Sequence, residues 1–166
     1  MESKLLISDA NILIDLEVGK LIDAMFQLPY EYAVPDLLFE QELNYQRDYL
    51  LDKGLQLLEL QDKAISRMLE LGQYYKGVSH IDLSALALAE QEHVSLLTGD
   101  RKLRQVCDRV NIEVHGTVWI IGKMLECEVI TVTDAENSYN GMEEAGSFLP
   151  WDEVKDQLKR YKKENG

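Results

Sequence analysis

The chain has 166 residues, 46% of them hydrophobic and 28% charged, so it is expected to fold as one globular unit without disulfide staples. Its net charge of −13 excludes a broad basic surface of the kind that binds nucleic acid by charge alone. No stretch approaches the roughly 18 uncharged apolar residues that span a bilayer, and no membrane association is expected.

The cysteines and the N-terminus indicate the compartment. Cys107 and Cys127 fit neither a disulfide framework nor the spacing of zinc ligands, and reduced cysteines are typical of intracellular proteins. Residues 1–4 are polar and the apolar run that follows is broken at once by Asp9, so no targeting segment is expected. Together these features predict a cytoplasmic protein.

Short apolar runs alternate with stretches of helical periodicity along most of the chain. In chain order the expected elements are a strand over 4–8, two short helices over 11–28 divided at Gly19, a strand over 31–35, a helix over 37–51, a strand or alternatively a helix over 55–60, and a helix over 62–75. They continue with an apolar helix from 80, a strand over 94–97, a helix over 103–107, a strand over 110–114, a helix over 116–124, and two amphipathic helices over 133–161 that break at Pro150.

This alternation predicts an α/β fold, a three-layer α/β/α sandwich with a central, mainly parallel sheet. Residues 1–130 are expected to form the core of the domain, and residues 131–166 a helical extension packed on the same domain. In a parallel sheet of this kind the ligand site lies at the carboxyl ends of the strands.

Three aspartates stand at positions that such a site would use. Asp9 follows a predicted strand directly, Asp100 comes three residues after the end of another, and Asp82 lies in the first turn of the apolar helix. Each of them alone is better explained as a helix cap or as a favourable charge at a helix N-terminus than as a metal ligand. If all three met at one sheet edge they would repel one another, and protonation, a nearby Lys or Arg, or a divalent cation would have to offset the repulsion.

Five short blocks are spread over most of the chain in a characteristic order. They are residues 7–14 (ISDANILI), 33–43 (AVPDLLFEQEL), 80–89 (HIDLSALALA), 96–103 (LLTGDRKL) and 115–121 (HGTVWII). In this order and spacing they resemble the PIN-domain family.

The resemblance implies a nuclease whose acidic cluster holds Mg²⁺ or Mn²⁺ and hydrolyses RNA with a metal-activated water. Matched by position, Asp9, Asp82 and Asp100 are implied as metal ligands. Glu40 is favoured as the fourth acid. Glu42 is the alternative, because it precedes Leu43 and so resembles a Glu-Leu pair that is frequent in the family. Relatives of this length are often toxins paired with a small antitoxin protein, and many form homodimers.

Some alternatives stay open. Arg101 and Lys102 follow Asp100 where some members carry a further acid, which leaves one or two metals open. With Arg104 they form a basic patch that either contacts phosphate or is a solvated helix face. The other functions considered are a non-catalytic module that docks a partner through residues 133–166, and a different Mg²⁺-dependent phosphohydrolase. The usual DxD pair of such phosphatases is lacking here.

Overall fold

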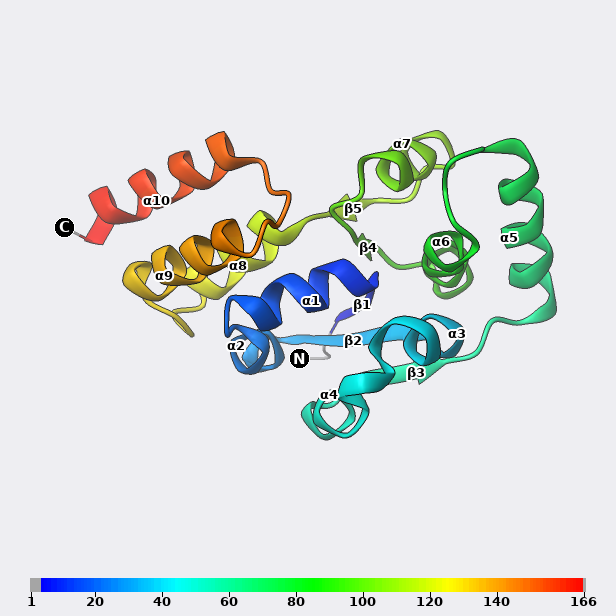
Figure 1. The fold of residues 1–166 in the computed structure, drawn as a ribbon, viewed down its shortest axis with the longest axis horizontal. Helices are drawn as coiled ribbons and strands as arrows, with labels where there is room; N and C mark the ends of the chain where they lie inside the picture. Colours follow the sequence, from blue (N-terminus) through cyan, green and yellow to red (C-terminus); the bar gives the residue numbers. More distant parts are fainter. Residues whose placement is uncertain (1–3, 166) are drawn as a thin grey trace.

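The protein is built on a parallel β-sheet. A computed structural model describes residues 4–165; residues 1–3, part of the predicted polar N-terminus, and residue 166 lie outside it. Within that range the sheet has five strands in the order β3-β2-β1-β4-β5, and all four pairings are parallel (Figure 1). The strands are β1 (Lys4–Ser8), β2 (Tyr30–Pro35), β3 (Gln56–Leu58), β4 (Leu96–Leu97) and β5 (Val114–His115).

Helices connect successive strands, as parallel pairing requires, and three more follow the last strand. They are α1 (Ala10–Val18), α2 (Ile22–Gln27), α3 (Asp36–Leu38), the π-helix η1 (Phe39–Leu43), the 3₁₀ turn η2 (Asn44–Gln46), α4 (Arg47–Lys53), α5 (Asp62–Tyr74), α6 (His80–Glu92), α7 (Arg101–Arg109), α8 (Thr117–Glu126), α9 (Val132–Glu144) and α10 (Trp151–Asn165). No helix in residues 4–165 is long and apolar enough to cross a membrane.

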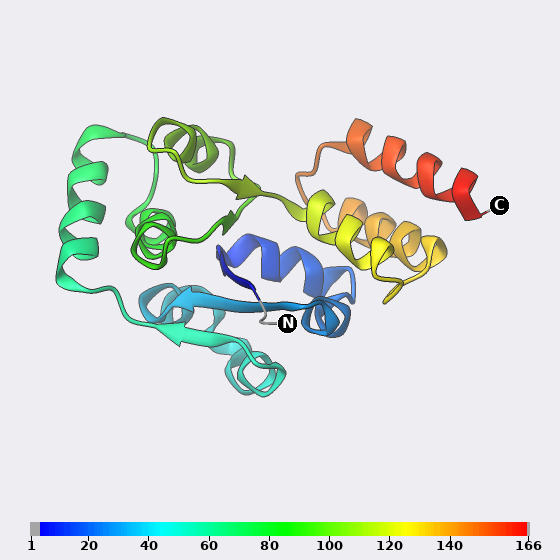
Figure 2. The ribbon, with the colours of Figure 1, turned by 180° about the vertical axis from the view of Figure 1, so that it is seen from behind.

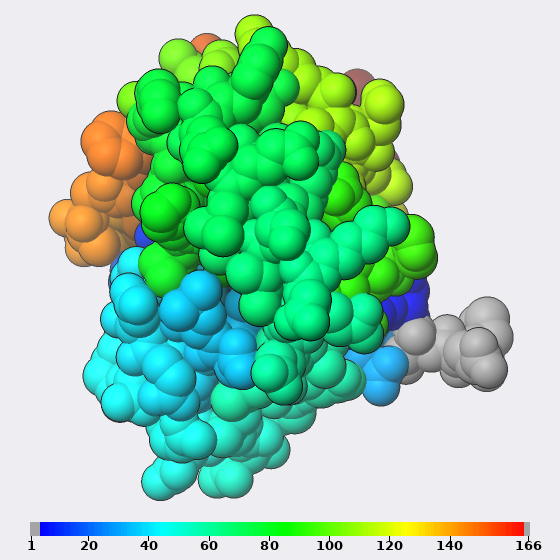
Figure 3. Space-filling model, turned by 90° about the vertical axis from the view of Figure 1, so that its right-hand side faces the viewer, coloured from blue at the N-terminus to red at the C-terminus, as the bar shows by residue number. Residues whose placement is uncertain are grey.

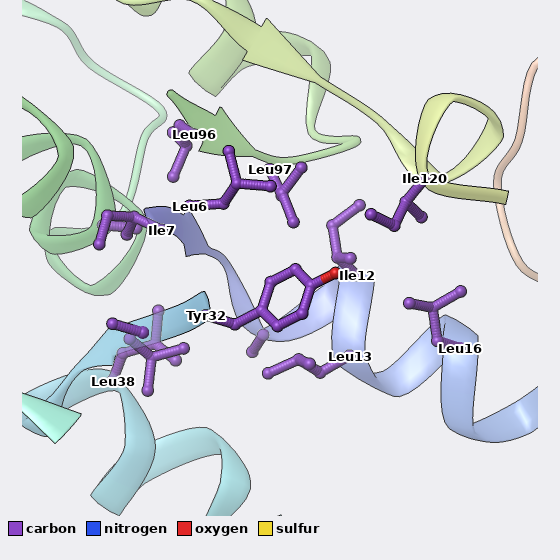
Figure 4. Close-up of a cluster of buried hydrophobic side chains, with 14 of the residues drawn as sticks. Leu6, Ile7, Ile12, Leu13, Leu16, Tyr32, Leu38, Leu96, Leu97 and Ile120 are labelled. Carbon is purple, nitrogen blue, oxygen red and sulfur yellow. The ribbon is translucent and has the colours of Figure 1, made fainter. Parts of the chain in front are cut away.

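Alternating side chains of the central strands fill both faces of the sheet. Leu6 and Ile7 are both fully buried on β1, and adjacent residues of a strand point to opposite faces. Figure 4 shows Ile7 toward the green helix, Leu6 on the other side beside Leu97, and Tyr32 of β2 next to Ile12 and Leu13 of α1. The buried Tyr32 hydroxyl donates a hydrogen bond to the Met25 carbonyl oxygen at 2.9 Å. Because both faces of the sheet are covered, the buried residues of β1 and β2 are apolar apart from Ser8.

The helices form a layer on either side of the sheet. Helix α6 packs on β1, β2 and β4, and α5 covers α6. Figure 3 shows α5 as the outer surface on that side, where Leu69 is 48% exposed. Helices α1, α8 and α9 pack together at the other end of the view, with α10 beyond them (Figures 1 and 2). The predicted three-layer α/β/α fold with a parallel sheet is confirmed.

Buried hydrogen bonds tie the two C-terminal helices to the rest of the protein. Tyr139 of α9 donates its hydroxyl proton to Gln157 Oε1 of α10 at 2.5 Å. The Gln157 side-chain amide in turn donates to the Val118 carbonyl oxygen of α8 at 2.9 Å. Ser138 donates to the carbonyl oxygen of Gly19, at the end of α1, also at 2.5 Å. The extension is thus joined by hydrogen bonds to α1 and α8.

Two predicted elements differ from the structure. The helix expected over 37–51 is interrupted by η1 and η2. The strand expected over 110–114 shrinks to β5 because the preceding residues close α7 instead. Asn111 adopts a left-handed conformation with φ of 63°, and Ile112 N–H donates to the Cys107 carbonyl oxygen at 2.9 Å. The apolar residues Val110 and Ile112 therefore complete a helix end rather than a strand.

The Tyr139–Gln157 bond gives a stability prediction. Tyr139→Phe leaves Gln157 Oε1 without its donor in a buried place, and we expect the free energy of unfolding to fall by about 1–2 kcal/mol. Urea denaturation measures the change. Tyr74→Phe is the matched control because Tyr74 is 76% exposed. Equal effects of the two substitutions would contradict the prediction.

Candidate functional site

The carboxyl ends of β1 and β4 bring two of the predicted acids to the same edge of the sheet. The strands are parallel neighbours, with Ser8 opposite Leu97, so the residues that follow each strand emerge side by side. Asp9 follows β1 directly, and its N–H donates to the Leu97 carbonyl oxygen at 2.9 Å. Asp100 lies three residues beyond the end of β4. The strand register therefore places Asp9 beside the turn that carries Asp100.

Asp9 is a buried carboxylate held by two hydrogen bonds. Only 2% of the residue is exposed. Its Oδ1 accepts from Ile12 N–H at 2.9 Å, which caps α1, and its Oδ2 accepts from the Thr98 hydroxyl. Burial raises the pKa of Asp9 to about 7 against the lowering effect of these two bonds, and the negative charges of Asp82 and Asp100 raise it further. Asp9 therefore caps α1 and also belongs to the group of neighbouring acids.

Asp100 has a similar double role. It is the N-cap of α7, where Oδ1 accepts from Leu103 N–H at 2.9 Å. Its own N–H donates to Thr98 Oγ1 at 3.1 Å. The Thr98 hydroxyl therefore lies between the two acids, since it donates to Asp9 and accepts from Asp100. Thr98 is thus placed to orient the Asp9 side chain and the turn that carries Asp100.

Asp82 approaches the same edge from α6. Ser79 caps this helix, and its hydroxyl accepts from Asp82 N–H at 3.1 Å. Burial raises the pKa of Asp82 against the Ser79 hydrogen bond, and the charges of Asp100 and Glu42 raise it further. The charge of Asp100 thus raises the pKa of both Asp9 and Asp82. Glu42 acts on Asp82 in the same way.

Glu40, favoured in the sequence analysis as the fourth acid, is engaged elsewhere. Its Oε1 lies 2.6 Å from Arg47 Nη1, and both side chains of this ion pair are about half exposed. Glu42, the alternative, is the glutamate whose charge acts on Asp82. Both lie in η1, whose π-helical geometry differs from the α-helix that the sequence predicts. Glu42 therefore replaces Glu40 in what we propose below.

The acids have no cationic partner in the part of the chain that the structure describes. None of the ion pairs there involves Asp9, Asp82 or Asp100. Nor do three or more Asp, Glu, His or Cys side chains among residues 4–165 gather closely enough to hold one ion as they stand. The donor set is nevertheless of the kind that Mg²⁺ and Mn²⁺ take, because carboxylate oxygens suit hard cations.

A groove of about 1300 Å³ opens beside Asp100. Arg101 and Arg104 of the predicted basic patch line it, whereas the Lys102 ammonium lies toward Gly77. Asn11 also lines the groove. The opposite wall comes from residues 146–150 and from α10, including Arg160. No sequence pattern indicates this wall, because its residues are far from Asp100 along the chain.

Comparisons with known proteins agree with this architecture. The family model DUF3368, described as a PIN domain, matches residues 5–163. A similar solved structure is a PilT N-terminus domain protein from the hyperthermophilic archaeon Sulfolobus solfataricus, with a TM-score of 0.52 and 12% sequence identity. The match covers 74% of this chain and 94% of that one, and it shows likeness of fold. No curated protein matches the chain.

Asp9 makes the stability of the metal-free protein depend on pH. Its ordinary pKa of 3.8, which it has in the unfolded chain, rises to about 7 on folding, so the folded state binds the proton more tightly. The free energy of unfolding should therefore fall as pH rises from about 4 through 7. Asp9→Asn removes this loss, and in EDTA at pH 8 we expect it to be more stable than the parent by about 2–4 kcal/mol.

Urea denaturation at pH 5 and at pH 8 measures the effect, and the difference should shrink at the lower pH. Asp62→Asn, at an exposed aspartate that begins α5, is the matched control. A stability difference that is the same at both pH values would contradict the assignment to the Asp9 carboxylate.

Proposed function

This chain belongs to the PIN-domain family, and we propose on that basis that it is a metal-dependent ribonuclease that hydrolyses phosphodiester bonds at the Asp9 edge of the sheet. PIN domains are typically nucleases. RNA as the substrate and Mg²⁺ or Mn²⁺ as the cofactor are the further parts of the proposal.

The observation that carries the proposal is the buried carboxylate of Asp9. The negative charges of Asp82 and Asp100 act on this carboxylate, and it has no Lys or Arg partner among residues 4–165. Two ways of offsetting the repulsion then remain, which are protonation and a divalent cation. Near neutral pH a cation that binds these oxygens displaces the proton, because the pKa of Asp9 is about 7.

The chain's own residues prepare such a site. Asp9, Asp82, Asp100 and Glu42 would hold the cation. Ile12 N–H and the Thr98 hydroxyl fix both oxygens of Asp9, while Leu103 N–H fixes one oxygen of Asp100. Carboxylates held in this way lose little side-chain freedom when they bind a ligand.

A bound divalent cation would supply positive charge against the phosphate and acidify a water molecule, which is the chemistry that phosphodiester hydrolysis needs. Thr98 keeps Asp9 and Asp100 in register through its single hydroxyl. The groove beside Asp100 gives a polymeric substrate a path to this edge.

Activity should depend on the aspartates at the two strand ends. We expect Asp9→Asn and Asp100→Asn to lower the Mn²⁺-dependent cleavage of a single-stranded oligoribonucleotide by at least about 100-fold, since each removes a negative charge from the cation site. Both substitutions keep a side-chain oxygen for the helix cap, so the fold should persist. Gel analysis of the cleavage products measures the rate, with circular dichroism as the check on folding.

Calorimetric titration with Mn²⁺ separates this function from a non-catalytic interaction module. Heat of binding in the parent that is lost in Asp9→Asn supports the cation site. Undiminished cleavage by both variants, or the absence of any metal-dependent heat in the folded parent, would overturn the proposal.

Glu40 and Glu42 form a matched pair for locating the fourth acid. Glu42→Gln should lower cleavage about 10–100-fold at limiting Mn²⁺, with partial recovery at high Mn²⁺ if the charge serves cation affinity. Glu40→Gln breaks only an exposed ion pair with Arg47, and its effect on cleavage should be small. The reverse ranking would return the role to Glu40.

A role as the toxin of a toxin–antitoxin pair is a further part of the proposal, and family membership is its support. A gene for a small DNA-binding protein next to this one would identify the partner to test. Suppression of cleavage when that protein is added would then be the expected result.

A further inference from the structure

The N-terminus of α8 lies at the same sheet edge as the proposed catalytic acids. Strand β5 pairs in parallel with β4, with His115 opposite Leu97, and the chain enters α8 through Gly116 immediately afterwards. Thr98 N–H donates to the His115 carbonyl oxygen at 3.0 Å. Neighbouring strands are about 4.8 Å apart, so the start of α8 lies roughly 10 Å from the end of β1.

This helix start offers unused hydrogen-bond donors. Gly116 is the N-cap, and it supplies no side-chain oxygen to the N–H groups of the first turn. Those groups carry the positive end of the helix dipole, which favours an anion. An uncapped helix start alone would not indicate a ligand, because water can satisfy it.

Thr117 provides an independent indication. It is 3% exposed and lines the groove beside Asp100. Among the described residues, its Oγ1 is the one buried side-chain oxygen or nitrogen without a hydrogen-bond partner. A buried hydroxyl that lacks a partner lowers stability, so it calls for an explanation such as a ligand that the hydroxyl meets on binding.

Gly116 keeps space open at the same point. Its φ of −110° and ψ of −170° are extended values that any residue adopts, so the backbone does not require glycine there. A Cβ at this position would lie 3.5 Å from Arg104 Nη1 and 3.7 Å from the Thr98 carbonyl oxygen, which are ordinary contacts. Protein packing therefore does not exclude a side chain. A methyl group there would occupy the space between the Arg104 guanidinium and the helix start.

Positive side chains stand among negative ones along the groove of this strongly acidic protein. Arg101, Arg104 and Arg160 line the groove and form no ion pair within residues 4–165. Acids line it as well, including Asp108 one turn beyond Arg104 on α7, without coming within 4.0 Å of these arginines. Arg104 is the guanidinium that stands beside Gly116.

We propose that the start of α8, with Thr117 and Arg104, binds a backbone phosphate of the RNA strand adjacent to the phosphate at the acidic edge. The inference rests on the proposed function for the identity of the strand. Arg104 and the first-turn N–H groups supply donors to the phosphate oxygens, and the Thr117 hydroxyl gains the partner that it lacks in the free protein. This positive site aligns the strand in a protein whose net charge is −13.

The test measures binding rather than cleavage. A fluorescein-labelled single-stranded oligoribonucleotide is titrated in EDTA against the full-length protein over a range of salt concentrations. Arg104→Gln should weaken binding roughly tenfold and lower the slope of log affinity against log salt by about 0.7, the value for one phosphate contact on a single strand. Lys102→Gln is the matched control, because it removes the same charge from the same helix outside the groove.

Thr117→Val and Gly116→Ala distinguish a ligand from a structural role. Thr117→Val keeps the side-chain shape and removes a hydroxyl without a partner, so the melting temperature should hold or rise while RNA affinity falls several-fold. Gly116→Ala should weaken binding with the fold intact, and if this variant does not fold, Thr117→Val and Arg104→Gln decide.

Equal effects of Arg104→Gln and Lys102→Gln, unchanged affinity of Thr117→Val, or failure of the parent to bind the oligonucleotide would each overturn the phosphate site. A parent that binds RNA in this Arg104-dependent way but does not cleave it with Mn²⁺ would refute the proposed nuclease function and leave the phosphate site standing.

Discussion

Asp9 sets the constraint on which the rest of the site depends. A parallel sheet brings the residues after β1 and β4 to one edge, and there the Asp9 carboxylate is almost completely buried beside two further aspartates. A charged group in such a place needs compensation, which hydrogen bonds from Ile12 and Thr98 supply only in part. The helix caps and the acidic cluster are therefore not alternatives, because one oxygen of Asp9 serves α1 while the other faces Thr98.

The acidity of the whole chain and an RNA substrate become compatible when charge is considered locally. The net charge describes the solvated surface, whereas a strand would meet the sheet edge and the groove beside it. At that edge the proposed cation would neutralise the acids. One strand further along, Arg104 and the start of α8 carry positive charge. Broad electrostatic attraction is replaced by two local positions, which favours selective binding over general affinity for nucleic acid.

The sheet, the layers and the positions of the aspartates could be predicted because they follow from local patterns. Lys4–Ser8 is an apolar run that ends in an acid, and Asp100 begins a helix after a similar run. The α-helical angle assumed between Glu40 and Glu42 does not apply, because η1 is a π-helix, and which of them is the fourth acid remains a proposal. The strand expected over 110–114 is also shorter than predicted. Asn111 adopts a left-handed conformation, so the apolar residues beside it pack at the end of α7 and do not extend β5.

The groove was the feature least predictable from the sequence, because the segments that line it come together only in the folded protein. Arg104 and Thr117 stand on one side, and α10 with the segment before it stands on the other. Gln157 links α10 to both α8 and α9, so the helix that forms the far wall is tied to the helix whose start faces the acids. Loosening these buried bonds would move the wall relative to the sheet edge. The C-terminal helices thus contribute to the shape of this groove as well as to the stability of the fold.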